Sequence, residues 1–480
     1  MNVKVSLKVL GLLVAINGLL MLLGIPFSII SKGDDISAIL IASGISILTG
    51  LTAWFFNKNA NKEIKKREGY IIVAFGWVLI SLFGALPYYI SGYIPSFTDA
   101  FFETISGYTT TGASILNDIE ALPQGLLFWR SMTHWIGGMG IIVLTVAILP
   151  ILGIGGMQLF VAEVPGPTPD KLHPRITETA KRLWIIYVLF TLIETVLLIF
   201  GGMSFFDAIC HSMATLATGG FSTQNDSIAG YSPYIQYVIT FFMLLAGINF
   251  SMHYWFLKGK FKKLWANEEF RFYLYIIAFL TIITCIILIS PVGKPFEEAF
   301  RTAAFMVVSI ITTTGFVTAD YTIWTPFIMM IFFLMMFWGG SSGSTAGGMK
   351  VVRLLLLSKN SLLELKRLIH PNAIVPVRLN TKAVKEDIIA KIQAFFIIYI
   401  LIFIAGSIIM SIIGLDFLSA IGSVAATLGN IGPGIGSVGP MDNFAQIPTI
   451  GKWFLAFLML LGRLELFTIL LLFTPYFWRK

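Results

Sequence analysis

The sequence FTDAFFETISGYTTTG, residues Phe97–Gly112, decides the fold, because its pattern occurs four times in the chain. Phenylalanine, alanine and threonine stand 15, 12 and 2 residues before its last residue, Gly112. The same offsets recur before Gly220 and Gly315, and before Gly432 with asparagine in place of the threonine. The four glycines are 108, 95 and 117 residues apart, so the chain contains an internal repeat of roughly a hundred residues.

Each repeated stretch predicts a short helix that ends in a loop. Phenylalanine and alanine three residues apart lie on one face of a helix, and about three turns are too short to span a bilayer. The partial negative charge of a helix C-terminus, followed by carbonyls that glycine lets turn to one side, suits a dehydrated cation. Four such loops around one axis predict a selectivity filter; ordinary re-entrant loops are the alternative that the coincident offsets disfavour. The predicted ion-binding residues are Thr110, Thr111, Gly112, Thr218, Gly219, Gly220, Thr313, Thr314, Gly315, Asn430, Ile431 and Gly432.

Composition places the chain in a membrane. Of its 480 residues, 56% are hydrophobic and 12% are charged, and the mean hydropathy is +0.85. A soluble protein of this size does not combine so much apolar surface with so few charges. The first apolar run, Val9–Ile30, is too long for a signal peptide and is expected to stay as a helix. Cys210 and Cys285 lack metal-ligand spacing and are expected to be buried thiols, although one disulfide is possible in principle.

The net charge of +8 reflects topology rather than nucleic-acid binding, since lysine and arginine gather on the cytoplasmic side of membrane proteins. With Lys350–Lys391 taken as one inner stretch, one full repeat separates each pair of consecutive basic clusters from Arg67 onward. We therefore expect each repeat to begin inside, cross, dip back through its loop and return, with both termini cytoplasmic. The clusters are Lys58–Arg67, Lys171–Arg182, Lys258–Lys263, Lys350–Arg367, Arg378–Lys391 and Arg479–Lys480.

The repeats divide the chain into five segments of an all-α polytopic membrane protein. These are an N-terminal helical hairpin over 1–60, repeats over 69–168, 169–264 and 265–370, the last with an intramembrane loop at 339–349, and a fourth repeat over 371–480. The expected outward helices are Tyr70–Ile90, Leu183–Phe200, Phe270–Ile289 and Ile388–Ile412. The expected return helices are Leu126–Pro150, Pro233–Phe256, Tyr321–Trp338 and Ile450–Phe477, and Gly153–Pro169 is expected to be an irregular connection.

The third return helix is interrupted by GGSSGSTAGG, Gly339–Gly348, before a helical pattern resumes at Lys350. Ten small residues do not hold a stable helix, and irregular backbone at membrane depth must face protein or water. We predict a flexible gate beneath the filter; close helix–helix packing is the alternative. The gate residues assigned here are Gly339, Gly340, Gly343, Gly347, Gly348 and Lys350.

Arg463 and Glu465 lie inside the apolar run of the fourth return helix. An ionisable residue at membrane depth costs about 2.5 to 3.5 kcal/mol on insertion scales and is a functional candidate. The two residues do not share a helix face, so separate partners or water are expected. We assign both to the gate, with Arg463 facing the pore just below the filter; a structural ion pair is the alternative for Arg463.

Taken together, these motifs resemble the membrane (TrkH-type) subunits of the Trk/Ktr/HKT superfamily of potassium transporters. The resemblance rests on TTTGA, TGGFS, TTTGF and NIGPG in the four loops and on HWIGGMG, GGSSGSTAGGMK and LGRLELFT elsewhere. It implies a K⁺ channel-like fold with four helix–loop–helix repeats around one pore, and the extra N-terminal hairpin looks like the Trk branch. It also implies that Gly112, Gly220, Gly315 and Gly432 line the filter, and that glycine rather than serine at Gly112 favours K⁺ over Na⁺.

The resemblance further implies K⁺ uptake across the cytoplasmic membrane by a homodimer with cytosolic nucleotide-binding (RCK/TrkA-type) regulatory subunits. K⁺ is then the bound ion, with no organic cofactor and no nucleic acid. A symporter coupling K⁺ to H⁺ or Na⁺ is the alternative. An enzyme is not indicated, because the chain has no nucleophile, metal cluster or acid–base pair with suitable spacing, and its GxGxxG at Gly434–Gly439 lacks the required strand and helix. His211 is interpreted as a hydrogen-bonded structural residue rather than a proton relay.

Overall fold

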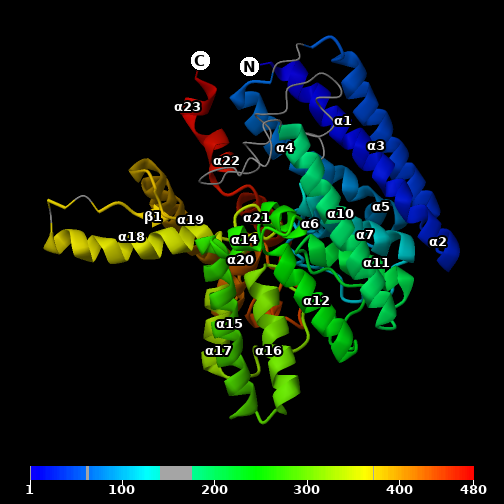
Figure 1. Cartoon of the computed structure of the whole chain (residues 1–480). Coiled ribbons are helices and arrows are strands. Elements are labelled where there is room, and N and C mark those ends of the chain that lie inside the picture. Colours follow the sequence, from blue (N-terminus) through cyan, green and yellow to red (C-terminus); the bar gives the residue numbers. More distant parts are fainter. Residues whose placement is uncertain (1, 61–63, 141–175, 371, 374, 480) are drawn as a thin grey trace.

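The structure is a computed structural model that describes residues 2–60, 64–140, 176–370, 372–373 and 375–479 (Figure 1). Helices account for almost all of its regular structure. The helices are α1 (Val3–Met21), η1 (Leu22–Gly24), α2 (Ile25–Ser31), α3 (Ile36–Phe56), α4 (Lys66–Gly84), α5 (Leu86–Ser91), α6 (Phe97–Tyr108), α7 (Gln124–Gly138), α10 (Ile176–Phe200), α11 (Phe205–Leu216), α12 (Pro233–Ala246), α13 (Phe250–Leu257), α14 (Phe261–Trp265), α15 (Glu268–Ile289), α16 (Phe296–Ile311), α17 (Pro326–Met335), α18 (Val351–Ile369), α19 (Glu386–Ile413), α20 (Phe417–Gly429), η2 (Gly436–Val438), α21 (Thr449–Arg463), α22 (Phe467–Leu470), η3 (Leu471–Phe473) and α23 (Pro475–Trp478).

Within these described ranges, six helical stretches are long and apolar enough to cross a membrane. They are Val3–Ser31, Ile36–Phe56, Arg67–Ser91, Lys181–Phe200, Glu268–Ile289 and Glu386–Ile413. Two further bent pairs, α12 with α13 and α21 with the helix after it, bring the number to eight if each pair is one span. A polytopic all-α membrane protein is therefore confirmed.

The loop helices α6, α11, α16 and α20 are short, as the repeat predicts, and three of them begin alike. Ser96, Ser204 and Asp416 each precede a helix, and each side chain accepts a hydrogen bond from the backbone N–H three residues later. Such caps satisfy donors that the first helical turn leaves open. The third, α16, starts a turn earlier than the predicted Phe300, because Pro295 and the acidic residues Glu297 and Glu298 favour a helix start there.

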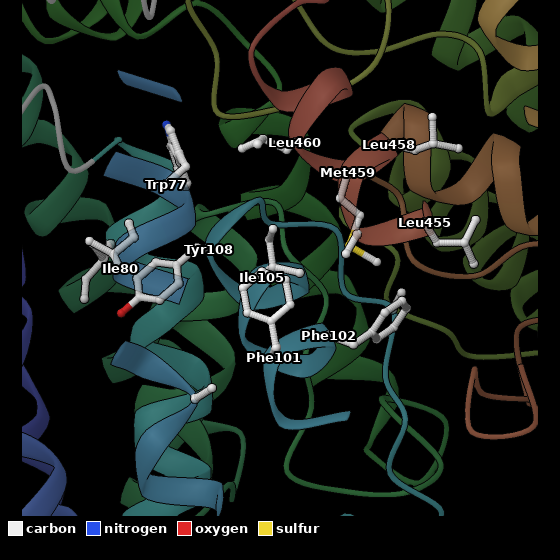
Figure 2. Close-up of a cluster of buried hydrophobic side chains, with 14 of the residues drawn as sticks. Trp77, Ile80, Phe101, Phe102, Ile105, Tyr108, Leu455, Leu458, Met459 and Leu460 are labelled. Carbon is white, nitrogen blue, oxygen red and sulfur yellow. The ribbon is translucent and has the colours of Figure 1, made fainter. Parts of the chain in front are cut away.

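The loop helices pack between helices that are distant in sequence. Helix α7 packs on α11, α12 on α16, and α21 on α6, so that the last return helix meets the first loop helix. Figure 2 shows Phe101, Phe102 and Ile105 of α6 between Trp77 and Ile80 on one side and Leu455 and Met459 on the other. The Phe101 ring stacks on Trp453 with 4.7 Å between ring centroids. This packing brings the first and last repeats together into a closed arrangement.

The N-terminal helices lie at the edge of this arrangement. Helix α3 runs back along α1, and both contact α4, while α2 and η1 reach α7 (Figure 1). Buried Asp35 joins the hairpin to α7, because its carboxylate accepts a hydrogen bond from the backbone N–H of Leu126 at 2.9 Å. The hairpin expected from the sequence is thus present, with its first helix beginning at Val3 rather than Val9.

The prediction of continuous return helices is wrong in two places. The expected Pro233–Phe256 is bent by 105° between α12 and α13, and the expected Ile450–Phe477 is bent by 111° after α21. At the first break Asn249 starts a new helix by accepting a hydrogen bond from Ser251 N at 2.8 Å. At the second, Glu465 and Leu466 adopt left-handed backbone with φ of 53° and 59°.

The other two return helices are shorter than expected in their described parts. Helix α17 covers Pro326–Met335 of the predicted Tyr321–Trp338, because Thr325 caps the helix start. Helix α7 ends at Gly138, and the remainder of the predicted Leu126–Pro150 from residue 141 lies outside the described residues. So do the predicted connection Gly153–Pro169 and the first residues of the basic cluster Lys171–Arg182.

Helix α18 leaves the interrupted segment, contacts α15 and α19, and extends sideways from the body of the molecule (Figure 1). It is followed by a small antiparallel pair, β1 (Arg378–Leu379) and β2 (Lys382–Ala383), with Arg378 opposite Ala383. The two chain ends lie on the same side of the molecule (Figure 1).

Candidate functional site

The four repeated loops adopt the same unusual backbone. The residue two before each glycine is in the left-handed region, which non-glycine residues seldom occupy; its φ is 52° at Thr110, 54° at Thr218, 56° at Thr313 and 54° at Asn430. The glycines have φ of 78° at Gly112, 80° at Gly220, 79° at Gly315 and 92° at Gly432. Asparagine tolerates this region well, which explains why the fourth loop keeps the geometry without a threonine.

The four glycines lie against one another's loops in chain order. A methyl group on Gly112 would lie 2.1 Å from the carbonyl oxygen of Gly219, and one on Gly220 would lie 2.0 Å from that of Thr314. On Gly315 it would lie 1.9 Å from the carbonyl oxygen of Ile431. On Gly432 it would lie 2.8 Å from the oxygen of Thr111, which closes the ring. Only glycine fits such close backbone approach.

A cavity of about 220 Å³ adjoins the ring and is lined by all four glycines. The rest of its lining comes mainly from residues that follow the glycines, including the side chains of Asn117, Asn225, Asp442 and Asn443. Arg130 also contributes to the wall. All four loops therefore open on one side into one polar space.

Side chains fix the loops below the glycines. The hydroxyls of Thr109 and Thr111 are 2.8 Å apart, and those of Thr312 and Thr314 in the third loop are also 2.8 Å apart. Asn430 Nδ2 donates to Thr111 Oγ1 at 3.0 Å, so the fourth loop is bonded to the first. No pattern in the sequence predicts this bond.

The segment between α17 and α18 lies against the loops from the other direction, because it contacts residues that precede the glycines. Gly347 N donates to Thr313 Oγ1 at 2.6 Å. Thr345 Oγ1 donates to the carbonyl of Leu216, the last residue of α11, at 2.9 Å. A methyl group on Gly347 would lie 2.7 Å from Asn430 Cβ. The segment is irregular backbone, as expected, and it is bonded to its surroundings rather than packed as a helix.

The glycines predicted to form the gate have distinct places in this segment. Gly343 and Gly348 adopt φ of 75° and 62°. Gly339 and Gly340 lie against backbone, since a methyl group on Gly339 would be 2.0 Å from the oxygen of Gly347. Lys350 is buried and donates from Nζ to the carbonyl of Ala346 within the segment.

Arg463 joins the segment to the first loop. Its Nη1 donates to Thr110 Oγ1 and to the carbonyl of Thr345, both at 2.9 Å. Its Nη2 donates to the carbonyls of Gly137 at 2.5 Å and Gly138 at 3.2 Å, at the end of α7. The guanidinium thus lies between the first loop, the interrupted segment and the end of α7. That it faces the pore remains a prediction.

Glu465 has a different partner, as expected from its spacing: it forms an ion pair with Arg353 at the start of α18. The guanidinium of Arg353 also lies 3.9 Å from the ring centroid of Phe395. Sequence reasoning missed both Thr345 and Arg353. The signals in the sequence were a hydroxyl residue between the two glycine pairs and an arginine three residues after Lys350.

His211 is fully buried and both ring nitrogens are hydrogen-bonded, which agrees with a structural role. Cys210 and Cys285 are both buried free thiols. Among the described residues no group of histidine, cysteine, aspartate and glutamate is arranged to hold a metal ion.

Comparison with known proteins gives the family. Residues 35–480 match the TrkH family, described as a cation transport protein. The "Trk system potassium uptake protein TrkH" of Salmonella typhimurium is 44% identical over 489 residues, with all of both chains covered.

The chain belongs to the TrkH family.

Other relatives agree with this assignment. "Trk system potassium uptake protein TrkG" of Escherichia coli K12 is 36% identical over 483 residues, covering 100% of this chain and 99% of its own. The crystal structure of the potassium transporter TrkH from Vibrio parahaemolyticus superposes with a TM-score of 0.90 at 38% identity, covering both chains completely. The resemblance seen in the sequence motifs is therefore confirmed, and the chain is a membrane cation transporter rather than an enzyme.

Proposed function

We propose that this chain carries K⁺ into the cell through a selectivity filter formed by the four loops. The observation that carries the proposal is the ring of close contacts from Gly112 through Gly220 and Gly315 to Gly432 and back. Repeated left-handed backbone beside a cavity common to the four loops suits replacement of a cation's water shell by carbonyl oxygens. Relatives named as potassium uptake proteins identify K⁺ as the cargo.

In this proposal the segment 339–349 and Arg463 form the gate. The segment contacts the third and fourth loops through Gly347 and the end of the second loop helix through Thr345, and Arg463 links it to the first loop. In this position it would obstruct the path below the filter. Arg463 adds a fixed positive charge, because its guanidinium stays protonated at any working pH. Lys350, at the start of α18, bonds back to the segment, and the ion pair between Arg353 and Glu465 joins α18 to the turn after α21.

We further propose that the chain works as a homodimer in the cytoplasmic membrane, with both termini in the cytosol. A cytosolic nucleotide-binding regulatory subunit would act on the gate from that side. The position of both chain ends on one side of the molecule and the basic residues around α18 support this orientation (Figure 1).

The filter is tested with Gly112→Ser. The added Cβ would lie 2.1 Å from Gly219 O at a residue whose φ is 78°, so the ring must deform. We expect the ratio of K⁺ to Na⁺ flux in proteoliposomes to fall by about tenfold, the factor that corresponds to about 1.4 kcal/mol. Gly92→Ser is the matched control, because Gly92 has a φ of 79° but no atom within 4 Å of an added Cβ. An unchanged ratio in folded Gly112→Ser would remove the filter assignment.

The same vesicles separate a passive pathway from a symporter. A passive pathway reverses at the K⁺ equilibrium potential. A shift of the reversal potential when only the H⁺ or Na⁺ gradient is changed would establish coupling instead.

A further inference from the structure

A buried ion pair stands behind the first two loops and is not explained by the filter or the gate. Arg130 of α7 and Glu103 of α6 are 2.7 Å apart between Nε and Oε1, and the residues are 2% and 1% exposed. A buried pair of this kind requires further hydrogen bonds to satisfy both groups. Those bonds lead to the outer arms of two different loops, that is, to the residues that directly follow the filter glycines Gly112 and Gly220.

Glu103 holds the arm that follows Gly112. Its Oε2 accepts from the backbone N–H of Ile115 at 2.9 Å, and Ser114 Oγ donates to Oε1 at 3.0 Å. The carboxylate therefore fixes the residues two and three positions beyond the first filter glycine.

Arg130 reaches the corresponding arm of the second loop. Its Nη1 donates to the carbonyl of Ser222, two residues after Gly220, at 2.8 Å. The guanidinium also stacks over the ring of Phe221, 3.5 Å from its centroid. One side chain thus connects the arms of loops one and two.

His211 holds the second arm from behind. Its Nε2 is 2.9 Å from Ser222 Oγ, while Nδ1 donates to the carbonyl of Asp207 at 2.7 Å. A carbonyl only accepts, which fixes Nδ1 as the protonated nitrogen on that side. The network therefore runs without a gap from Ile115 to α11.

The supporting side chains of this network occupy the same position in successive repeats. Glu103 and His211 both stand nine residues before their filter glycines, and Met306 occupies that position in the third repeat. Met306 Sδ accepts from the backbone N–H of Thr318, three residues after Gly315, at 3.4 Å. The same helix position supports the outer arm in three loops, but only loops one and two carry ionisable groups there and a bridging arginine.

We propose that Glu103, Arg130 and His211 are positioning residues that set the spacing between the first two filter loops and thereby the choice among alkali cations. The proposal rests on the filter function proposed above. None of the three touches the ring glycines' own carbonyls through a described hydrogen bond, so their effect is transmitted through Ser114, Ile115 and Ser222.

Two single variants test it. Arg130→Lys keeps a charge beside Glu103 but loses the fork that reaches Ser222, and Glu103→Gln keeps the side-chain shape. We expect each to lower the K⁺ to Na⁺ flux ratio of purified protein in liposomes by about fivefold to tenfold. A role in folding alone would reduce the amount of folded protein and leave this ratio unchanged. Glu298→Gln is the matched control, because it breaks the partly exposed ion pair between Glu298 of α16 and Lys294. It should leave the K⁺ to Na⁺ flux ratio unchanged.

Ser114→Ala and Ser222→Ala serve if the charged variants do not fold, because each removes one hydroxyl of the network, and each should lower the ratio by at least about twofold. Unchanged ratios in the network variants, with a lowered ratio in Gly112→Ser, would overturn the positioning role and leave the filter in place. Unchanged ratios in all of them, including Gly112→Ser, would overturn the filter and this inference together.

Discussion

Replacing Arg463 with alanine is the sharpest test of the gate. The guanidinium joins the interrupted segment to the first loop through Thr345 O and Thr110 Oγ1, both at 2.9 Å, and rests on the carbonyls that end α7. The alanine variant removes these bonds and the charge together. We therefore expect the K⁺ flux per folded molecule to rise in the absence of any regulatory subunit.

Two contributions set the size of the rise. A hydrogen bond to a charged group is worth about 1.5 to 3 kcal/mol, and the bond to Thr345 must break whenever the segment moves away. Its loss favours the open arrangement by about 2 kcal/mol, or roughly thirtyfold. Repulsion between the guanidinium and a cation at about 6 Å, with an effective dielectric near 20, is roughly 3 kcal/mol. Because the two contributions need not add, we expect an increase of about tenfold or more.

The free energy of unfolding of Arg463→Ala is expected to fall, although its K⁺ flux rises. The carbonyls of Gly137 and Gly138 lose their donor, and each unsatisfied buried acceptor costs about 1 to 3 kcal/mol. Flux must therefore be divided by the amount of monodisperse protein that is reconstituted. Rubidium uptake into liposomes under a fixed K⁺ gradient provides the measurement.

Arg463→Lys separates the two contributions. The ammonium keeps the positive charge but cannot span acceptors on Thr110, Thr345 and α7 at once. Flux close to that of the unmodified chain would assign the barrier to charge, and flux close to that of the alanine variant would assign it to anchoring of the segment. A fall in flux per folded molecule in Arg463→Ala would refute the gate and leave Arg463 as a structural residue.

Two further variants extend these tests. Gly347→Ala places a Cβ 2.7 Å from Asn430 Cβ and 2.8 Å from Gly429 O, so it should displace the segment and raise basal Rb⁺ uptake severalfold. Uptake equal to that of the unmodified chain would show that the segment does not obstruct the path. Glu194→Gln should leave the thermal unfolding temperature in detergent unchanged or slightly raised. Both carboxyl oxygens of Glu194 are buried beside Thr215 without a regular hydrogen bond in the described part of the chain. A fall in the free energy of unfolding by more than about 3 kcal/mol would reveal a partner of that carboxyl group.

The internal repeat made the loop geometry predictable. Equal offsets before Gly112, Gly220, Gly315 and Gly432 correspond to helices that all end three or four residues before their glycines. The residue two before each glycine then has the same left-handed backbone in all four loops. The separate partners of Arg463 and Glu465 were predictable for a similar local reason, since neighbours two apart point in different directions.

The breaks in the return helices were not predictable from local pattern. Hydropathy is the same for a continuous and a broken apolar helix, and the break after α12 depends on distant residues. Gly247 O accepts from Ser341 N at 2.8 Å, and Phe250 N donates to Gly343 O at 3.0 Å, so the segment of the third repeat replaces bonds that a continuous helix would make. The Arg130–Glu103 pair was not predictable from the sequence, because both residues lie in amphipathic stretches whose polar face accommodates a charge.

The broken helices and the interrupted segment explain one another. A helix that ends at membrane depth leaves carbonyls without donors, and lipid offers none. Here the carbonyls of Leu216 and Ala246 accept from Thr345 Oγ1, and that of Gly247 accepts from Ser341 N. If the segment moves away, the same carbonyls require water, so opening and wetting of the path must occur together. Each exchange of a protein donor for water changes the free energy by only about 1 kcal/mol. If this segment is the proposed gate, its two arrangements differ by a few kcal/mol, which is comparable to the coupling free energy of about 1 to 3 kcal/mol that a bound partner typically supplies.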